Sequence, residues 1–202
     1  MAESPHLRSD FWAACEEGNQ TECQQWTQAL NQGKAGPQSN WQAQKYLTKA
    51  CKKDQGWACN DLGRMHVEQQ AKKPSEKKAL VLFELACSLE YMEGCANAAW
   101  MLYNAKGVDR LSEEEKRDFN MDDRGDDDSM DSAVADNRRL VSLYRQACEG
   151  GYAPACDRLG DFFVEGDRVP ATPRKAADFY AMACEQGFSE SCLGLGRLLA
   201  TG

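Results

Sequence analysis

Long apolar runs are missing from this 202-residue chain, and their absence excludes a membrane-spanning helix from the sequence pattern. Crossing a bilayer takes roughly 20 consecutive apolar residues, and no run approaches that length. The first five residues, Met1 to Pro5, also lack the basic start and apolar stretch of a secretory signal. We therefore expect a chain without a signal peptide and without membrane insertion.

Histidine is scarce, because only His6 and His66 are present. Zinc centres combine cysteine with imidazole or with closely spaced further cysteines, and the cysteine spacing described below is not that of a zinc knuckle. Thioredoxin-like and haem-attachment cysteine motifs are absent as well. His66 falls at a predicted core position. The sequence thus predicts no metal, no cofactor and no catalytic residues.

Basic residues are in the minority, with 24 lysines and arginines against 32 aspartates and glutamates, a net charge of -8. This balance disfavours nucleic acid as a partner, because the two would repel each other. Eleven acidic and only four basic residues fall in residues 108–132. We expect that segment to be an acidic, partly disordered insertion. A calcium loop starting at Asn120 is disfavoured, because Arg124 would occupy a ligand position.

Cysteine, by contrast, is abundant and strictly spaced. The ten cysteines form five couples, each eight residues apart: Cys15/Cys23, Cys51/Cys59, Cys87/Cys95, Cys148/Cys156 and Cys184/Cys192. Successive couples begin 36, 36, 61 and 36 residues apart, so one interval carries 25 extra residues. A constant period of this length indicates a stacked repeat.

Other positions follow the same period. Alanine always precedes the first cysteine, and apolar residues stand four and eight positions before it, which places them on one face of a helix. The second cysteine begins another such face, with apolar or small residues three, four, six and seven positions later. Several of the short polar stretches between the cysteines contain glycine, which can end a helix. Each unit therefore predicts a helix, a tight turn and a second helix.

The bond geometry of a disulfide agrees with this prediction. Eight residues of continuous helix span about 12 Å, whereas a disulfide requires Cα atoms within about 7 Å. Each couple can close only if the chain reverses between its two cysteines, which favours local pairing. Other connectivities, buried free thiols, and reactive thiols of a haem or copper chaperone remain alternatives at this point.

Two blocks of the sequence resemble a known family. Tyr144-x-x-Ala147-Cys148-x-x-Gly151-x-x-x-Ala155-Cys156-x-x-Leu159-Gly160 and the matching block from Tyr180 to Gly196 resemble Sel1-like repeats, specifically the cysteine-rich subgroup typified by the Helicobacter cysteine-rich proteins. The resemblance covers most of the chain apart from the insertion. It implies an all-α fold, a right-handed α/α superhelical solenoid related to tetratricopeptide arrays, with five helix pairs and disulfides within the units, forming one domain over residues 1–202.

The resemblance also implies a non-catalytic adaptor or scaffold that binds another protein or peptide in a concave groove. An inhibitory immunity-type protein and an assembly factor are two versions of this function. The alternative is a β-lactam-binding or β-lactam-hydrolysing enzyme, since some cysteine-rich members carry that label. Five disulfides would place the chain in the periplasm, outside the cell or in the mitochondrial intermembrane space.

Polar positions left over on the second helices are candidates for binding the partner. They stand one, two and five residues after the second cysteine, and stacking would align them in a stripe. The candidates are Asn60, Asp61, Arg64, Asn97, Trp100, Asp157, Arg158, Asp161 and Arg197. Such side chains suit the recognition of a peptide, and the acidic chain suits a basic partner. An ordinary solvated face is the alternative.

The last predicted helix carries apolar residues that no following unit covers. Leu195 and Leu199 stand at positions predicted to face the core, and Leu198 stands at the position predicted to pack against the next unit. We expect these side chains to be exposed, which would favour self-association at this end.

Overall fold

The computed structural model describes residues 37–104 and 132–201, together with residues 21 and 25. The predicted Cys15/Cys23 disulfide and the acidic insertion up to residue 131 lie outside the described residues. Within these ranges the chain is helical and contains no strand, so the all-α prediction is confirmed.

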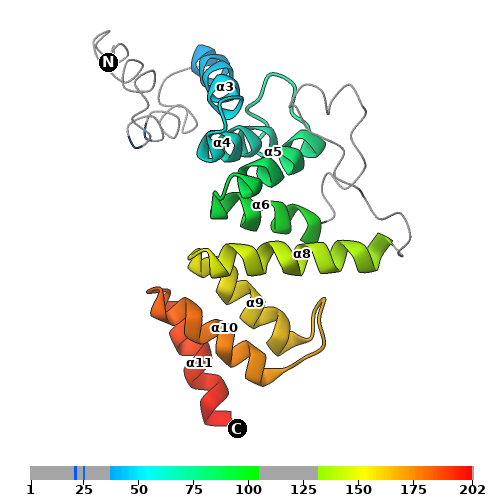
Figure 1. The fold of residues 1–202 in the computed structure, drawn as a ribbon, viewed down its shortest axis with the longest axis vertical. Coiled ribbons are helices and arrows are strands. Elements are labelled where there is room, and N and C mark those ends of the chain that lie inside the picture. Colours follow the sequence, from blue (N-terminus) through cyan, green and yellow to red (C-terminus); the bar gives the residue numbers. More distant parts are fainter. Residues whose placement is uncertain (1–20, 22–24, 26–36, 105–131, 202) are drawn as a thin grey trace.

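Eight described helices form four antiparallel pairs, stacked along the long axis of the molecule (Figure 1). Each pair joins a first helix to a second helix through a short turn. The pairs are α3 (Pro37–Cys51) with α4 (Gly56–Val67), α5 (Glu76–Ser88) with α6 (Met92–Tyr103), α8 (Ser132–Glu149) with α9 (Ala153–Glu165), and α10 (Pro173–Glu185) with α11 (Ser189–Thr201). Helix α8 packs on α6, so the stack continues across the insertion.

Helix boundaries follow local sequence signals. The hydroxyl of Ser75 accepts a hydrogen bond from the backbone N–H of Lys78, at 3.3 Å, and caps the start of α5. Pro173 is the first residue of α10, where a missing N–H costs nothing. Gly166 ends α9 in the left-handed conformation, with φ 73°, and its N–H bonds to the carbonyl of Phe162.

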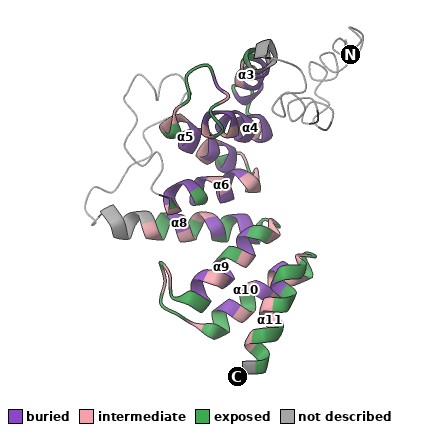
Figure 2. Ribbon diagram, turned by 180° about the vertical axis from the view of Figure 1, so that it is seen from behind, coloured by how far each residue is buried: buried purple, intermediate pink, exposed green. Residues whose placement is uncertain are grey.

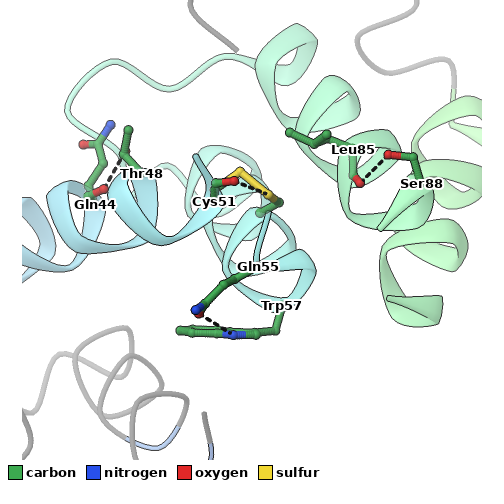
Figure 3. Close-up of a disulfide and its surroundings, with 8 residues drawn as sticks. Gln44, Thr48, Cys51, Gln55, Trp57, Leu85 and Ser88 are labelled. Carbon is green, nitrogen blue, oxygen red and sulfur yellow. Dashed lines mark hydrogen bonds between the residues drawn. A yellow bond between two sulfur atoms is a disulfide. The ribbon is translucent and has the colours of Figure 1, made fainter. Parts of the chain in front are cut away.

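A disulfide joins the two helices of each described pair. The bonds are Cys51–Cys59, Cys87–Cys95, Cys148–Cys156 and Cys184–Cys192, with Cα atoms 4.5–4.8 Å apart. Figure 3 shows the first of them linking the end of α3 to the start of α4. Local pairing, rather than the free-thiol alternative, therefore holds for all eight described cysteines. In the chain-entropy model each such loop contributes about 2.5 kcal/mol.

The turns between the paired helices depend on one left-handed residue, the third after the first cysteine. Gly151 (φ 93°) and Gly187 (φ 88°) fill this role in the last two pairs, as expected for glycine. Asp54 (φ 58°) and Glu90 (φ 59°) occupy the same position in the first two pairs. A side chain in this conformation costs about 1 kcal/mol or more, so these two turns are held in place by their surroundings.

Contacts between neighbouring pairs repeat along the stack. The ring of Phe83 on α5 packs over Gly63 on α4, and the ring of Tyr180 on α10 packs over Gly160 on α9. The alanine before each first cysteine is buried in all four described pairs. On α11, Leu199 is 72% exposed as expected, whereas Leu195 and Leu198 are half-buried rather than exposed (Figure 2).

Candidate functional site

Hydrogen bonds between side chains link successive second helices, and three of the four residues involved, Asn60, Asn97 and Asp157, belong to the predicted stripe. The amide of Asn97 on α6 donates a hydrogen bond to the side-chain oxygen of Asn60 on α4, at 2.8 Å. The hydroxyl of Ser191 on α11 donates to the carboxylate of Asp157 on α9. Helices α4 and α6 also pack directly against each other. These contacts place side chains of successive second helices next to one another, while the role of the predicted stripe in binding a partner stays a prediction.

A further contact joins the middle of the stack. The guanidinium carbon of Arg158 on α9 lies 5.8 Å from the ring centre of Tyr103 at the end of α6. Together with the two hydrogen bonds, this contact completes a line of polar links from α4 through α6 and α9 to α11. We call the surface along this line the second-helix face, defined by Arg64, Asn97, Trp100, Tyr103, Asp157, Arg158, Asp161 and Arg197.

Two predicted contact residues do not belong to this surface. Asn60 is fully buried and Asp61 is only 7% exposed, so neither side chain is presented to a partner. Asn60 lies between α4 and α6, where it instead accepts the hydrogen bond that holds the side chain of Asn97. The remaining seven predicted residues are exposed or half-buried, and Trp100 is 38% exposed.

Charges of both signs alternate on the second-helix face. Arg64 pairs with Glu68 at 3.4 Å, and Arg158 pairs with Asp161 at 3.5 Å. Exposed pairs of this kind contribute little to stability, so the arginines can exchange an internal partner for an external one at small cost. The face therefore offers hydrogen-bond donors, acceptors and the aromatic rings of Trp100 and Tyr103.

Two tyrosines behind this face stay uncharged. Burial raises the pKa of Tyr144, although the charge of Arg158 opposes this effect. Burial also raises the pKa of Tyr180, and its hydrogen bond to Asp161, 2.8 Å between the oxygens, raises it further. Burial likewise raises the pKa of Asp157, while its bond from Ser191 acts in the opposite direction. The neutral hydroxyl of Tyr180 therefore remains a hydrogen-bond donor that holds the carboxylate of Asp161 in place.

The repeat pattern missed two residues of this region. Tyr103 lies beyond the last position that the pattern assigns to a face, and Arg168 lies in the loop between α9 and α10. The guanidinium of Arg168 stands 5.0 Å from the ring centre of Tyr103 and donates to the side chain of Asn137, at 3.1 Å, on α8. Neither residue has a counterpart at a fixed spacing, so no periodic signal could have found it.

Two described residue groups have the composition of a catalytic site but a structural role. Ser75 and Lys78 have the Ser-x-x-Lys spacing of penicillin-recognising enzymes, but here the Ser75 hydroxyl caps α5 by accepting from the backbone of Lys78. His66 is buried, and burial together with the charge of Lys78 lowers its pKa to about 4. In residues 37–104 and 132–201, no group of three or more histidine, cysteine or acidic side chains could hold a metal ion.

None of the described helices is both long enough and apolar enough to span a bilayer.

Comparison with known proteins identifies the repeat. The family model of the Sel1 repeat matches residues 28–55, 58–91 and 153–188. A search of curated proteins by sequence finds no match. Among solved structures, a Sel1 repeat protein from Oxalobacter formigenes is 16% identical, with a TM-score of 0.61. That match covers 96% of this chain and 65% of the other, so this chain spans just under two thirds of its length.

A second solved structure is similar to this chain over nearly the whole length of the solved protein. Cysteine-rich protein B of Helicobacter pylori is 20% identical, with a TM-score of 0.53, and the match covers 79% of this chain and 97% of the other. At this level of identity the likeness concerns the fold. The described part of this chain shares that fold of stacked helix pairs, and in it each pair is joined by a disulfide.

Proposed function

We propose that this chain, which the Sel1 repeat model matches over residues 28–55, 58–91 and 153–188, is a Sel1-repeat protein that acts as a non-catalytic scaffold and holds a partner protein or peptide against the second-helix face. Sel1 repeats generally mediate protein–protein interaction. The observation that supports this surface is the line of polar links from Asn60–Asn97 through Tyr103–Arg158 to Asp157–Ser191. The links fix the spacing of exposed side chains over four helices, and a preorganised surface loses less entropy on binding.

The chemistry of the face suggests how a peptide would be held. Trp100 supplies a partly exposed ring of the kind that anchors interfaces, and Asn97 supplies an amide that can bond to a peptide backbone. Arg64 and Arg158 can form bidentate bonds with carboxylates or carbonyl groups, while Asp161 can accept from basic side chains. The partner therefore matches a pattern of charges rather than a single net charge.

The setting of this function would be an oxidising compartment. Four disulfides in the described residues would not persist where thiols are kept reduced, which favours the periplasm or the extracellular space, or the mitochondrial intermembrane space in a eukaryotic cell. An immunity-type inhibitor and an assembly factor both fit a scaffold in such a compartment. They differ in the partner: the inhibitor blocks a toxin, and the assembly factor holds an incomplete complex.

Quantitative co-purification from the native compartment tests the proposal. We expect a partner to be enriched with the wild-type chain and lost with the double variant Arg64→Glu/Arg158→Glu. The matched control is Arg145→Glu/Arg174→Glu, which makes the same charge change at two exposed arginines on the first helices α8 and α10. Equal recovery of the partner with both double variants would refute the assignment of the second-helix face.

A further inference from the structure

Positive charge is concentrated at the α3 end of the molecule, although the chain as a whole is acidic. Residues 37–78 contain nine lysines and arginines against four aspartates and glutamates. The stretch from Cys23 to Lys53 contains no acidic residue at all. This end of the stack therefore differs in its electrostatics from the rest of the chain.

One side of α3 presents an aromatic ring and a row of lysines to solvent. Trp41, Lys45 and Lys49 follow one another at intervals of four residues, which places them on the same side of the helix. All three are exposed, and Trp41 is 54% exposed. The ammonium nitrogen of Lys45 lies 5.6 Å from the centre of the Trp41 ring. Lys52 and Lys53 extend the exposed row into the turn after α3.

Two further lysines come from a different part of the chain. The backbone N–H of Lys72 donates to the side-chain oxygen of Gln44 on α3, at 2.9 Å, and this bond holds the loop between α4 and α5 beside α3. Figures 1 and 2 both show that loop next to α3. Lys72 and Lys73 are exposed there. We define the lysine face as Trp41, Lys45, Lys49, Lys52, Lys53, Lys72 and Lys73.

The charges of the lysine face are not neutralised by the described part of the chain. None of its six lysines forms an ion pair with a described residue. The face ends within the turn after α3, where Asp54 follows Lys53 and, with Trp57, Glu90 and Tyr91, lines an open pocket of about 350 Å³. Six like charges along one helix, its following turn and the adjoining loop repel one another, so an acidic ligand that bound there would relieve the repulsion.

We propose that the lysine face is a second interaction surface, which binds an acid-rich segment of a partner protein. Coulomb attraction between several lysines and a run of carboxylates steers and holds such a segment, and Trp41 adds an apolar anchor. An extended nucleic acid or an anionic bilayer fits less well, because it would reach beyond this face to the acidic remainder of a chain with a net charge of -8. A short peptide segment can remain on the face.

The lysine face is separate from the second-helix face. It is built from a first helix and a loop, whereas the second-helix face runs over α4, α6, α9 and α11. The two surfaces can therefore be tested independently of each other.

Fluorescence polarisation with a fluorescein-labelled deca-glutamate peptide tests the proposal at low and at physiological ionic strength. We expect Lys45→Glu/Lys49→Glu to weaken binding by about tenfold or more, and rising salt to weaken it further. The control Arg145→Glu/Arg174→Glu carries the same charge change far from the face and should change the affinity less than about twofold. Trp41→Ala should weaken binding of the peptide by a factor between those of the Lys45/Lys49 variant and of the control. Arg64→Glu/Arg158→Glu should weaken it no more than the control does.

Circular dichroism checks that each variant is folded, and Lys72→Glu/Lys73→Glu in the loop serves as the second variant if the α3 variant is not. The proposal fails if the wild-type chain does not bind deca-glutamate, or if the control pair weakens binding as much as the α3 pair. It also fails if a deca-thymidine oligonucleotide or phosphatidylserine vesicles compete more strongly than unlabelled deca-glutamate, because the partner would then be of another class.

Discussion

The side chain of Asn97 reaches from α6 to the oxygen of the fully buried Asn60 on α4, with 2.8 Å between the two atoms. A buried polar group that loses its partner costs about 1–3 kcal/mol, because water cannot replace the bond. Asn97→Ala should therefore lower the free energy of unfolding by about that amount, measured by urea denaturation of the oxidised protein. In a double-mutant cycle with Asn60→Ala, the two losses should be less than additive, and full additivity would show that the bond does not contribute.

The contact between Phe83 and Gly63 predicts that a methyl group is not tolerated at residue 63. A Cβ there would lie 2.7 Å from the Phe83 ring, so α4 and α5 would have to separate. Overpacking of this kind costs about 1–3 kcal/mol, and Gly63→Ala should lower the melting temperature accordingly. Gly196 is the matched control, since it lies within α11 with nothing within 4 Å of an added Cβ. Gly196→Ala should stabilise the chain by up to about 1 kcal/mol through helix propensity.

His66 should make stability depend on pH. Burial and the charge of Lys78 lower its pKa in the folded chain to about 4, from the usual 6.5. Between these two pKa values the unfolded chain binds more protons than the folded chain. The contribution of neutral His66 to the free energy of unfolding is therefore fully present above pH 6.5 and is lost as the pH drops toward 4. The loss would amount to at most about 3 kcal/mol.

The variant His66→Leu separates this effect from other titrations, because the equivalent position of the next unit holds the buried Leu102. Urea midpoints measured across the pH window should fall less steeply for the variant. Asp157, whose pKa is raised by burial, acts in the opposite direction in both proteins and cancels in the comparison. Parallel profiles for the two proteins would contradict a neutral buried histidine.

The Cys184–Cys192 bond should be the first of the four described disulfides to be reduced. Cys192 is exposed and Cys184 half-buried, whereas the six cysteines of the other three bonds are all buried. Reduction requires a thiolate to reach a sulfur atom, so access sets the order. Brief treatment with dithiothreitol, alkylation and peptide mass spectrometry should label these two cysteines first, and earlier labelling of a buried bond would contradict the exposure found here.

Local features of this fold could be predicted from the sequence because each unit repeats a short-range pattern. Disulfide pairing across eight residues requires a reversal of the chain, and the four described bonds confirm it. The burial of Ala50, Ala86, Ala147 and Ala183 follows from helical spacing alone. Glycine was expected as the left-handed turn residue, but Asp54 and Glu90 take that conformation, since the bond and the packing impose it.

Features that depend on neighbouring units could not be predicted in this way. The buried Asn60 on α4 is bonded to Asn97 on α6, a contact between units that no single unit encodes. The contact of Arg168 with Tyr103 joins a loop to a helix more than 60 residues earlier. The lysine face likewise depends on the bond from Lys72 to Gln44, which brings two distant lysine groups together.

Site-specific photo-cross-linking tests the central claim most directly. A benzoylphenylalanine introduced in place of Trp100 should cross-link a defined partner in the native compartment, because this residue lies in the middle of the second-helix face. The same group in place of the exposed Arg145, on the first helix α8, should give no cross-link of comparable yield. Equal yields at both positions, or a partner captured only from residue 145, would contradict a scaffold that holds its partner against its second helices.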